Sequence, residues 1–337
     1  MRKKHLMKKR GLCRVTALLL AMTAAVSPVN VMAETGSGEK SYKTVKKEKK
    51  EPEGLKVFNG VKYVPKGNLE TYLFMGIDDA NKVHKKTEYD GSGQCDMLLL
   101  MVRDISKGTY RTLPIDRNTM TDVKSLDIEG NYLATTKNQI ALSHSDGDGM
   151  EISCENTIDA VSGLLYGQEI DGYIALNMGA IKTVNHLVDG VTVTVQDDLT
   201  AADPSLRIGE TVTLTDDQAE IFVRRRMDVA DGTNENRISR QSQYLAALEP
   251  KLREICNRDS SFPNEVYKAL EDYMVTNITM QKFTKLALLL SQEEDDEGAL
   301  AIEGTAELGY MDFIEFTPDE ESLQEVVATL FYEEYEE

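Results

Sequence analysis

The sequence predicts a layered α/β domain, and three observations lead to that class. Apolar runs of strand length occur at 69–76, 97–102 and 109–113. Further on, segments with helical spacing of apolar residues alternate with short apolar runs. The chain has 337 residues, of which 41% are hydrophobic, so it is long enough for one large core or two small ones. Strands that alternate with helices are typical of a sheet covered by helices.

The three predicted strands place charged side chains at their ends. Asp78 and Asp79 follow the first strand, Asp96 lies at the entry to the second, and Arg117 follows the third. Taken singly, each carboxylate is better explained by a loop turn or a helix cap. In open α/β sheets, however, ligands bind at the carboxyl ends of strands. The repetition therefore indicates a site at this edge of the predicted sheet.

The middle of the chain contains the predicted helices. Apolar spacing predicts helices at 151–165, 178–187, 216–225 and 239–255, with strands at 173–176 and 191–195. Thr215 is the expected N-cap of the third helix because its hydroxyl can accept a bond from the first turn. The polar, Gly-rich stretch at 143–149 is interpreted as a loop over the site. These elements complete the predicted domain, to which we assign residues 68–256.

The C-terminal part of the chain is strongly acidic. From Ser291 to the end there are 17 acidic residues and no basic ones. Apolar residues nevertheless have strand-like spacing at 302–316 and helical spacing at 323–331. Residues 257–337 are therefore predicted to form an acidic extension that folds as a strand or hairpin plus a helix.

The N-terminus has the pattern of an export signal. Residues 1–33 contain seven basic residues and no acidic ones, then an apolar run at 15–26, and end in Val31-Met32-Ala33. The alternative is an uncleaved membrane anchor, although the apolar run is short for a span. Residues 34–67 are predicted to be a Lys-rich flexible linker that can lie against a membrane surface. We therefore expect an extracytoplasmic protein that works at the outer face of the cytoplasmic membrane.

Charge and cysteine usage exclude several classes of protein. Acidic residues outnumber basic ones 57 to 38, giving a formal net charge of −19. Such a surface repels phosphate backbones, so nucleic acid is excluded as the main partner. The four widely spaced cysteines match neither a disulfide scaffold nor a zinc site.

An arginine-rich segment is the second chemical feature. Five arginines fall within 17 residues, at 224, 225, 226, 237 and 240. The guanidinium group binds phosphate or carboxylate bidentately and does not lose its proton. Asp228, Asp231 and Glu235 lie nearby, so a local salt-bridge network is the alternative. Carboxylates for a divalent cation together with arginines for oxyanions are typical of phosphoryl transfer. The chain contains no GxxxxGK[ST] loop and no GxSxG motif.

Five blocks in this order resemble the LytR-CpsA-Psr family. They are Leu73–Asp78 (LFMGID), Gln94–Asp96 (QCD), Asp116–Thr119 (DRNT), Val223–Arg226 (VRRR) and Arg237–Gln241 (RISRQ). The resemblance implies an α/β/α domain with a central mixed sheet. It also implies an extracytoplasmic phosphotransferase that moves a glycopolymer, such as teichoic acid or capsular polysaccharide, from a polyprenyl-pyrophosphate carrier onto peptidoglycan.

The resemblance also implies roles for individual residues. Asp78 and Asp96 would hold Mg²⁺ or Mn²⁺, and Asp96 and Arg117 would be catalytic. The pyrophosphate would be bound by Gln94, Arg117, Arg224, Arg226, Arg237, Arg240 and Gln241. Four positions depart from the family pattern: Gln94 stands where arginine is usual, Asp116 where proline is usual, Asn118 where aspartate is usual, and Arg225 where tyrosine is usual.

Two other readings remain open at this point. One is an exported binding or regulatory module that holds polyprenyl-pyrophosphate lipids without turnover. The other is a wall-associated interaction protein in which the arginines are structural.

Overall fold

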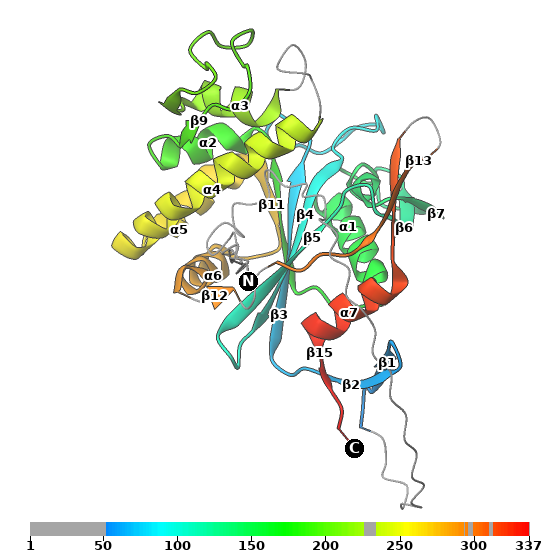
Figure 1. Ribbon diagram of the computed structural model, residues 1–337. Coiled ribbons are helices and arrows are strands. Elements are labelled where there is room, and N and C mark those ends of the chain that lie inside the picture. The colour runs from blue at the N-terminus through cyan, green and yellow to red at the C-terminus, as the bar shows by residue number, and fades with distance from the viewer. Residues whose placement is uncertain (1–51, 226–233, 293, 296–298, 310–312, 337) are drawn as a thin grey trace, which may run out of the picture.

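A mixed six-stranded sheet forms the centre of the computed structural model, which describes residues 52–225, 234–292, 294–295, 299–309 and 313–336 (Figure 1). Its strand order is β11–β8–β3–β4–β5–β12. β3 pairs antiparallel with β4 and parallel with β8. The strands are β3 (Leu69–Ile77), β4 (Cys95–Asp104), β5 (Thr109–Ile115), β8 (Gly172–Asn177), β11 (Met274–Thr276) and β12 (Glu294–Asp295). The mixed sheet that the resemblance implied is confirmed.

The central strands are apolar throughout because both faces of the sheet are covered. Successive side chains of a strand point to opposite faces, so Leu73 and Phe74 on β3 enter two different cores. On one face the core includes residues of α2 (Ala180–Leu187), α3 (Asp216–Arg224), α4 (Asn234–Arg258), α5 (Phe262–Leu270) and α6 (Met280–Gln292). On the other face it includes residues of α1 (Glu151–Leu164) and α7 (Glu320–Phe331). The result is an α/β/α sandwich (Figure 1).

Short elements surround this sandwich. β6 (Met120–Leu126) and β7 (Tyr132–Gln139) form a hairpin that leads into the 3₁₀ helix η3 (Ile140–His144). A second 3₁₀ helix, η4, spans Glu271–Tyr273. Two further antiparallel pairs are β9 (Thr192–Thr194) with β10 (Thr211–Thr213), and β13 (Gly304–Leu308) with β14 (Ile314–Pro318).

Thr215 caps α3 as the sequence predicts. Its hydroxyl accepts a hydrogen bond from the Gln218 amide at 3.3 Å, and the Gln218 side chain accepts one from the Thr215 amide at 3.0 Å. This reciprocal pair satisfies two backbone donors that the first helical turn leaves free. Asp216 and Asp217 follow in the first turn, where negative charge stabilises a helix.

The predicted linker at 34–67 ends earlier than expected. β1 (Lys56–Phe58) and β2 (Val61–Pro65) form a hairpin, and β15 (Tyr332–Glu334) adds to β2 as a third strand. Asn59 and Gly60 form the two-residue turn with φ of 47° and 79°, which is the geometry that Asn-Gly favours between strands. The lysine-rich composition obscured this hairpin. The predicted signal peptide at 1–33 and linker residues 34–51 lie outside the described residues.

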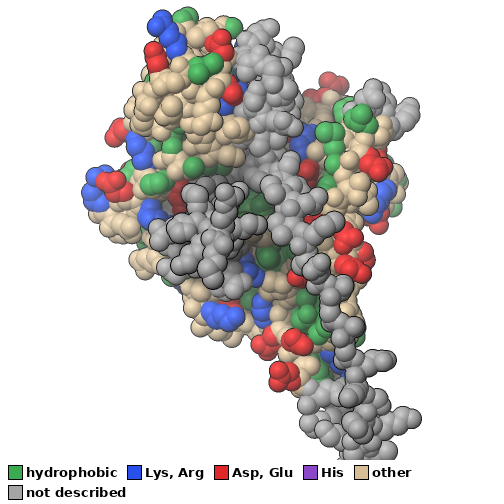
Figure 2. Space-filling model, viewed as in Figure 1, with side chains coloured by type: hydrophobic (Ala, Val, Ile, Leu, Met, Phe, Trp, Pro, Cys, Tyr) green, Lys and Arg blue, Asp and Glu red, His purple; other side chains and the backbone are tan. Residues whose placement is uncertain are grey.

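The chain beyond residue 257 contributes to the same cores as the residues before it. Apolar residues of α5 and α6 pack with α4, and β11 extends the central sheet beside β8. α7 packs on the opposite face, and acidic side chains lie over this region of the surface (Figure 2). Within the described part of the chain, no helix combines the length and the apolar character that a membrane span requires.

Candidate functional site

Gln94, Asp96 and Arg117 come together where β3, β4 and β5 meet at one end of the sheet. The amide of Asp78 donates to the Gln94 carbonyl at 2.9 Å, which closes the long loop between β3 and β4. Gly76 faces Met97 and Ile77 faces Cys95, so the register shifts at this point and Asp96 is the extra residue. Such bulges redirect side chains next to functional sites. Here the bulge places the Asp96 carboxylate against Arg117.

Arg117, which follows β5, is held by two side chains at the start of β4: Gln94, which precedes the strand, and Asp96 within it. Its Nη1 donates to Asp96 Oδ1, and its Nη2 donates to Gln94 Oε1 at 2.6 Å. The Asp96 side chain is 8% exposed, whereas that of Arg117 is 23% exposed. A charge-assisted bond of this kind is stronger than a neutral one. The guanidinium therefore has a fixed position, and one part of it remains open to an anion.

The backbone around Arg117 is also fixed, partly by the C-terminal region. The Asp116 carboxylate accepts from the Asn118 amide at 2.8 Å, which forms a tight turn. The amide of Phe316 on β14 donates to the Asn118 carbonyl at 2.9 Å, and Gln139 Nε2 donates to the Ile314 carbonyl at 2.6 Å. No pattern in the sequence indicated that the acidic extension would brace the site. The spacing of apolar residues within a short segment cannot predict a contact between residues about 200 positions apart, such as Asn118 and Phe316.

Arg240 and Gln241, which the resemblance placed at the pyrophosphate, are buried between α3 and α4. Arg240 is 2% exposed; its Nε donates to the Phe222 carbonyl at 2.8 Å and its Nη1 to Asp197 Oδ2 at 2.7 Å. Its Nη2 donates to the Arg225 carbonyl. Gln241 donates to the Val223 carbonyl at 3.2 Å. Both side chains thus hold the C-terminal end of α3, where helix carbonyls lack intrahelical partners.

Arg224 lies at the last turn of α3 and is accessible. Its side chain is 29% exposed and donates to Glu220 at 2.5 Å, and Lys182 reaches the other oxygen of the same carboxylate at 2.9 Å. Burial opposes ionisation of Glu220, but the bonds from Lys182 and Arg224 outweigh it and lower the pKa of Glu220. Arg226 and the side chain of Arg237 lie outside the described residues.

Asp78 and Asp96 are the candidate metal ligands. Asp78 is exposed, directly follows β3, and is bonded through its amide to the segment that carries Asp96. Among the described residues there is no group of three or more acidic, His or Cys side chains that would hold a metal. Two carboxylates are nevertheless a suitable protein contribution for Mg²⁺, which takes its other ligands from water and substrate phosphates. The donor set therefore fits the ion that the resemblance implies.

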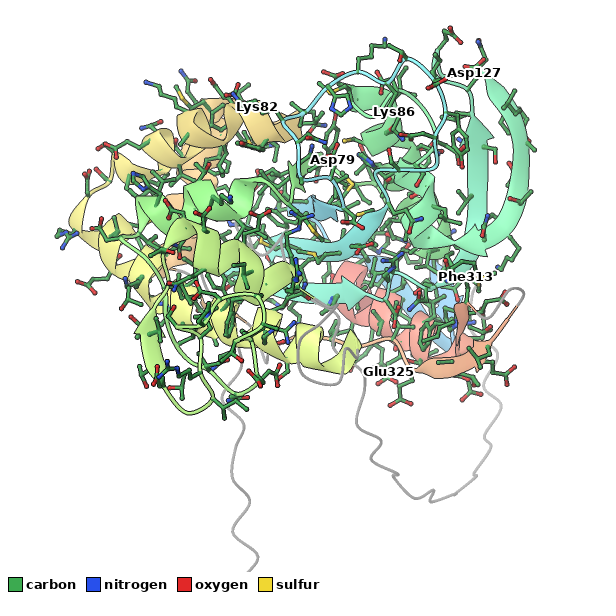
Figure 3. All side chains as sticks on the ribbon, turned by 90° about the horizontal axis from the view of Figure 1, so that it is seen from above. Asp79, Lys82, Lys86, Asp127, Phe313 and Glu325 are labelled. Carbon is green, nitrogen blue, oxygen red and sulfur yellow. The ribbon has the colours of Figure 1, made fainter. Side chains whose placement is uncertain are left out.

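The stretch at 143–149, predicted to be a loop over the site, is buried instead. Ser143, His144 and Ser145 are at most 2% exposed. The loop between β3 and β4 is the accessible one, and it crosses the top of the molecule with Asp79, Lys82 and Lys86 along it (Figure 3). Lys82 pairs with Asp272 at 2.6 Å, and the Lys86 amide donates to the Asp148 carbonyl at 2.8 Å. These two contacts connect the loop to the helical layers on both faces of the sheet.

His144 belongs to the stretch that the sequence placed over the site, but no role was predicted for its side chain. Its Nδ1 lies 2.8 Å from the Gly93 carbonyl, next to Gln94, and its Nε2 lies 3.6 Å from the Cys154 sulfur. Burial lowers the pKa of His144 to about 4, so the ring is neutral near pH 7. A single buried histidine carries no sequence signal of its own.

Comparison with known proteins gives a consistent result. A profile of the LytR_cpsA_psr family matches residues 29–331. No curated protein matches the chain. Several solved structures share the fold. TagV of B. subtilis is 24% identical, with a TM-score of 0.55 over 79% of this chain and 96% of TagV. Protein gbs0355 from Streptococcus agalactiae is 18% identical, with a TM-score of 0.59. The match covers 78% of this chain and 87% of gbs0355.

A third structure contains a ligand. It is described as TagT bound to LI-WTA, and it is 18% identical with a TM-score of 0.54, covering 78% of this chain and 90% of TagT. At these identities the structures establish the fold alone, whereas the family profile spans most of the chain. The chain belongs to the LytR-CpsA-Psr family.

Proposed function

We propose that the protein is an extracytoplasmic phosphotransferase that moves a glycopolymer from a polyprenyl-pyrophosphate carrier onto peptidoglycan. Membership of a family of cell-wall glycopolymer transferases supports this proposal. The observation that carries it is the partly open Arg117 guanidinium, held between Asp96 and Gln94 at one end of the central sheet. A planar donor fork fixed at such an edge is suited to a phosphate oxyanion.

The proposed reaction uses these residues as follows. A hydroxyl of the peptidoglycan sugar attacks the phosphorus that is bonded to the glycopolymer. The bond from that phosphorus to the bridging oxygen breaks, and polyprenyl phosphate leaves with the electron pair. Arg117 stabilises the negative charge on the phosphoryl oxygens, and the hydroxyl proton passes to a site carboxylate, for which Asp96 is the candidate.

A divalent cation fits beside this arginine. Mg²⁺ or Mn²⁺ held by Asp78 and Asp96 would neutralise charge on the pyrophosphate. With Asp96 as a ligand of the cation, the Arg117 guanidinium would be available to the substrate. Arg224, Arg226 and Arg237 are the further candidates for the anion, since the resemblance assigns them this role.

A second candidate function is a binding module without turnover, and Gln94 favours it. Relatives usually carry arginine at this position, whereas here the neutral amide accepts a bond from Arg117. One charged donor for the pyrophosphate is thereby lost. A charge-assisted hydrogen bond contributes about 1.5–3 kcal/mol, so this change alone can slow transfer substantially.

Replacing Arg117 tests both candidates. R117A should lose binding of a polyprenyl-pyrophosphate sugar in titration calorimetry while its circular dichroism spectrum is retained. R258A removes an exposed arginine at the far end of α4 and should bind as the unmodified protein does. Unchanged binding by R117A would contradict the site. With peptidoglycan oligosaccharide and Mg²⁺ added, release of polyprenyl phosphate identifies the transferase, and binding without release identifies the binding module.

A further inference from the structure

The 3₁₀ helix η3 contacts both chain segments that carry the Gln94–Asp96–Arg117 group. At its start, the Ala141 amide donates to the Arg117 carbonyl at 3.1 Å. At its end, the His144 ring reaches the Gly93 carbonyl at 2.8 Å. Gly93 and Arg117 are 24 positions apart in sequence, yet one turn of helix bridges them. The first contact is a backbone bond, so the second is the one that depends on side-chain identity.

The chemistry of His144 fixes which atom donates. A carbonyl oxygen only accepts, so Nδ1 carries the proton and donates to Gly93. The buried ring is neutral, because burial lowers its pKa to about 4, and Nε2 therefore has a lone pair. The Cys154 sulfur lies 3.6 Å from Nε2, and burial raises the pKa of that thiol, so the thiol donates. Both ring nitrogens have defined and different partners.

The conformation of the segment around Gly93 is held by side chains from other parts of the chain. Gly93 has a φ of 69°, a conformation that other residues rarely adopt. Lys86 provides a second contact, because its Nζ donates to the carbonyls of Ser92 at 2.8 Å and Ser145 at 3.0 Å. The carbonyls of two successive residues, Ser92 and Gly93, are thus held by side chains. The next residue, Gln94, is the one that contacts Arg117.

We propose that His144 is a positioning residue of the pyrophosphate site. Its Nδ1–H holds the Gly93 carbonyl, which places the Gln94 side chain so that it braces the Arg117 guanidinium for the anion. Lys86 assists by holding Ser92. The inference rests on the proposed function, since it assigns an anion to Arg117. It concerns residues behind the site that do not touch the substrate.

Two substitutions separate the two ring nitrogens. The amide of asparagine in H144N can donate close to the position of Nδ1, whereas the longer glutamine in H144Q reaches toward Nε2. Both remove the ring and should lower the melting temperature by similar amounts. The probe is inorganic pyrophosphate with Mg²⁺, measured by calorimetry. We expect H144Q to bind about fivefold more weakly, the equivalent of one lost hydrogen bond, and H144N to bind within about twofold of the unmodified protein.

Amide exchange in the absence of ligand gives a second readout. The Asp78 amide donates to the Gln94 carbonyl, so its exchange rate reports on the same segment. It should be about fivefold faster in H144Q and K86M, and unchanged in H144N and C154A. Lys86 lies on the loop between β3 and β4 and holds Ser92 independently of the His144 ring, so K86M tests the positioning of this segment if a His144 variant does not fold.

The outcomes distinguish the two proposals. If the unmodified protein binds no pyrophosphate, the proposed function fails, and exchange still decides whether His144 positions Gln94. If pyrophosphate binds, but the loss of affinity in H144Q and H144N simply follows the loss of melting temperature in each variant, His144 has only a structural role. Equal exchange of the Asp78 amide in all variants would likewise overturn the inference.

Discussion

Arg117 and Arg240 belong to two blocks of the same family pattern, but their surroundings differ. Arg117 pairs with a carboxylate and an amide and is 23% exposed. Arg240 is 2% exposed and donates to two backbone carbonyls and to Asp197. A carboxylate partner can be exchanged for a phosphate, whereas backbone carbonyls belong to the fold. The comparison separates an accessible arginine, for which we propose an anion as ligand, from a buried arginine that holds the fold, although both belong to the same family pattern.

The largest effect is expected for R240M. Removing this guanidinium leaves Asp197 without its ion-pair partner and leaves two carbonyls at the end of α3 without a hydrogen-bond donor. The free energy of unfolding should therefore fall by about 3–5 kcal/mol. Urea denaturation measures it, with R258M as the control for loss of an exposed arginine. A loss below about 1 kcal/mol together with lost pyrophosphate affinity would place Arg240 with Arg117.

The pH dependence of stability tests whether His144, which holds the segment next to Arg117, is a buried neutral ring. The pKa of His144 is lowered from 6.5 to about 4 on folding, so the unfolded chain binds the extra proton between these values. Stability is therefore lost as the pH falls from 6.5 to 4, by about 3 kcal/mol from this group. H144N has no titrating ring and should show a correspondingly shallower slope in denaturation at each pH. Parallel slopes for the two proteins would contradict a buried neutral ring.

Q94R tests whether the surroundings of Arg117 bind an anion. It adds a second guanidinium beside Arg117 and restores the family residue, so pyrophosphate binding should tighten by about tenfold. Because the two like charges repel without an anion, the free protein should be less stable by about 1 kcal/mol. Q94M is the control, since it removes the acceptor for Arg117 and adds no charge. Weaker binding by Q94R would show that this edge does not take the anion.

The smallest stability effect is expected for R224Q. Glu220 keeps Lys182 as a partner, so the loss should be below about 0.5 kcal/mol. Pyrophosphate affinity should nevertheless fall, because Arg224 is accessible and belongs to the proposed anion site. Melting curves and calorimetry on the same preparation separate the two effects. A large loss of stability would make Arg224 a scaffold residue like Arg240.

Local patterns were sufficient to predict much of the fold. The apolar runs of β3, β4 and β5 and the cap at Thr215 are properties of short segments, and each is found where the sequence indicates it. The family resemblance supplied the mixed character of the sheet. The Asn59-Gly60 hairpin was also readable in principle, but it lies in a lysine-rich stretch that looked like linker.

The site was harder to predict because its geometry is set by distant contacts. Spacing identified Asp96 and Arg117 but not the bulge that directs Asp96 onto the guanidinium. Arg237 and Arg240 look equivalent in sequence, and only burial shows that Arg240 holds α3. His144 and Phe316 reach the site from far along the chain, which no local pattern can report.

The antiparallel pairing of β15 with β2 determines where the two ends of the described chain emerge. β2 leads into the start of β3, and nine residues of strand, about 30 Å, separate that point from the Arg117 end of the sheet. If the segment before residue 52 holds the protein at a bilayer, an upright molecule would carry its reactive edge well above the headgroups. Under the proposed function, the molecule would then have to tilt toward the bilayer for Arg117 to reach the pyrophosphate of a carrier lipid.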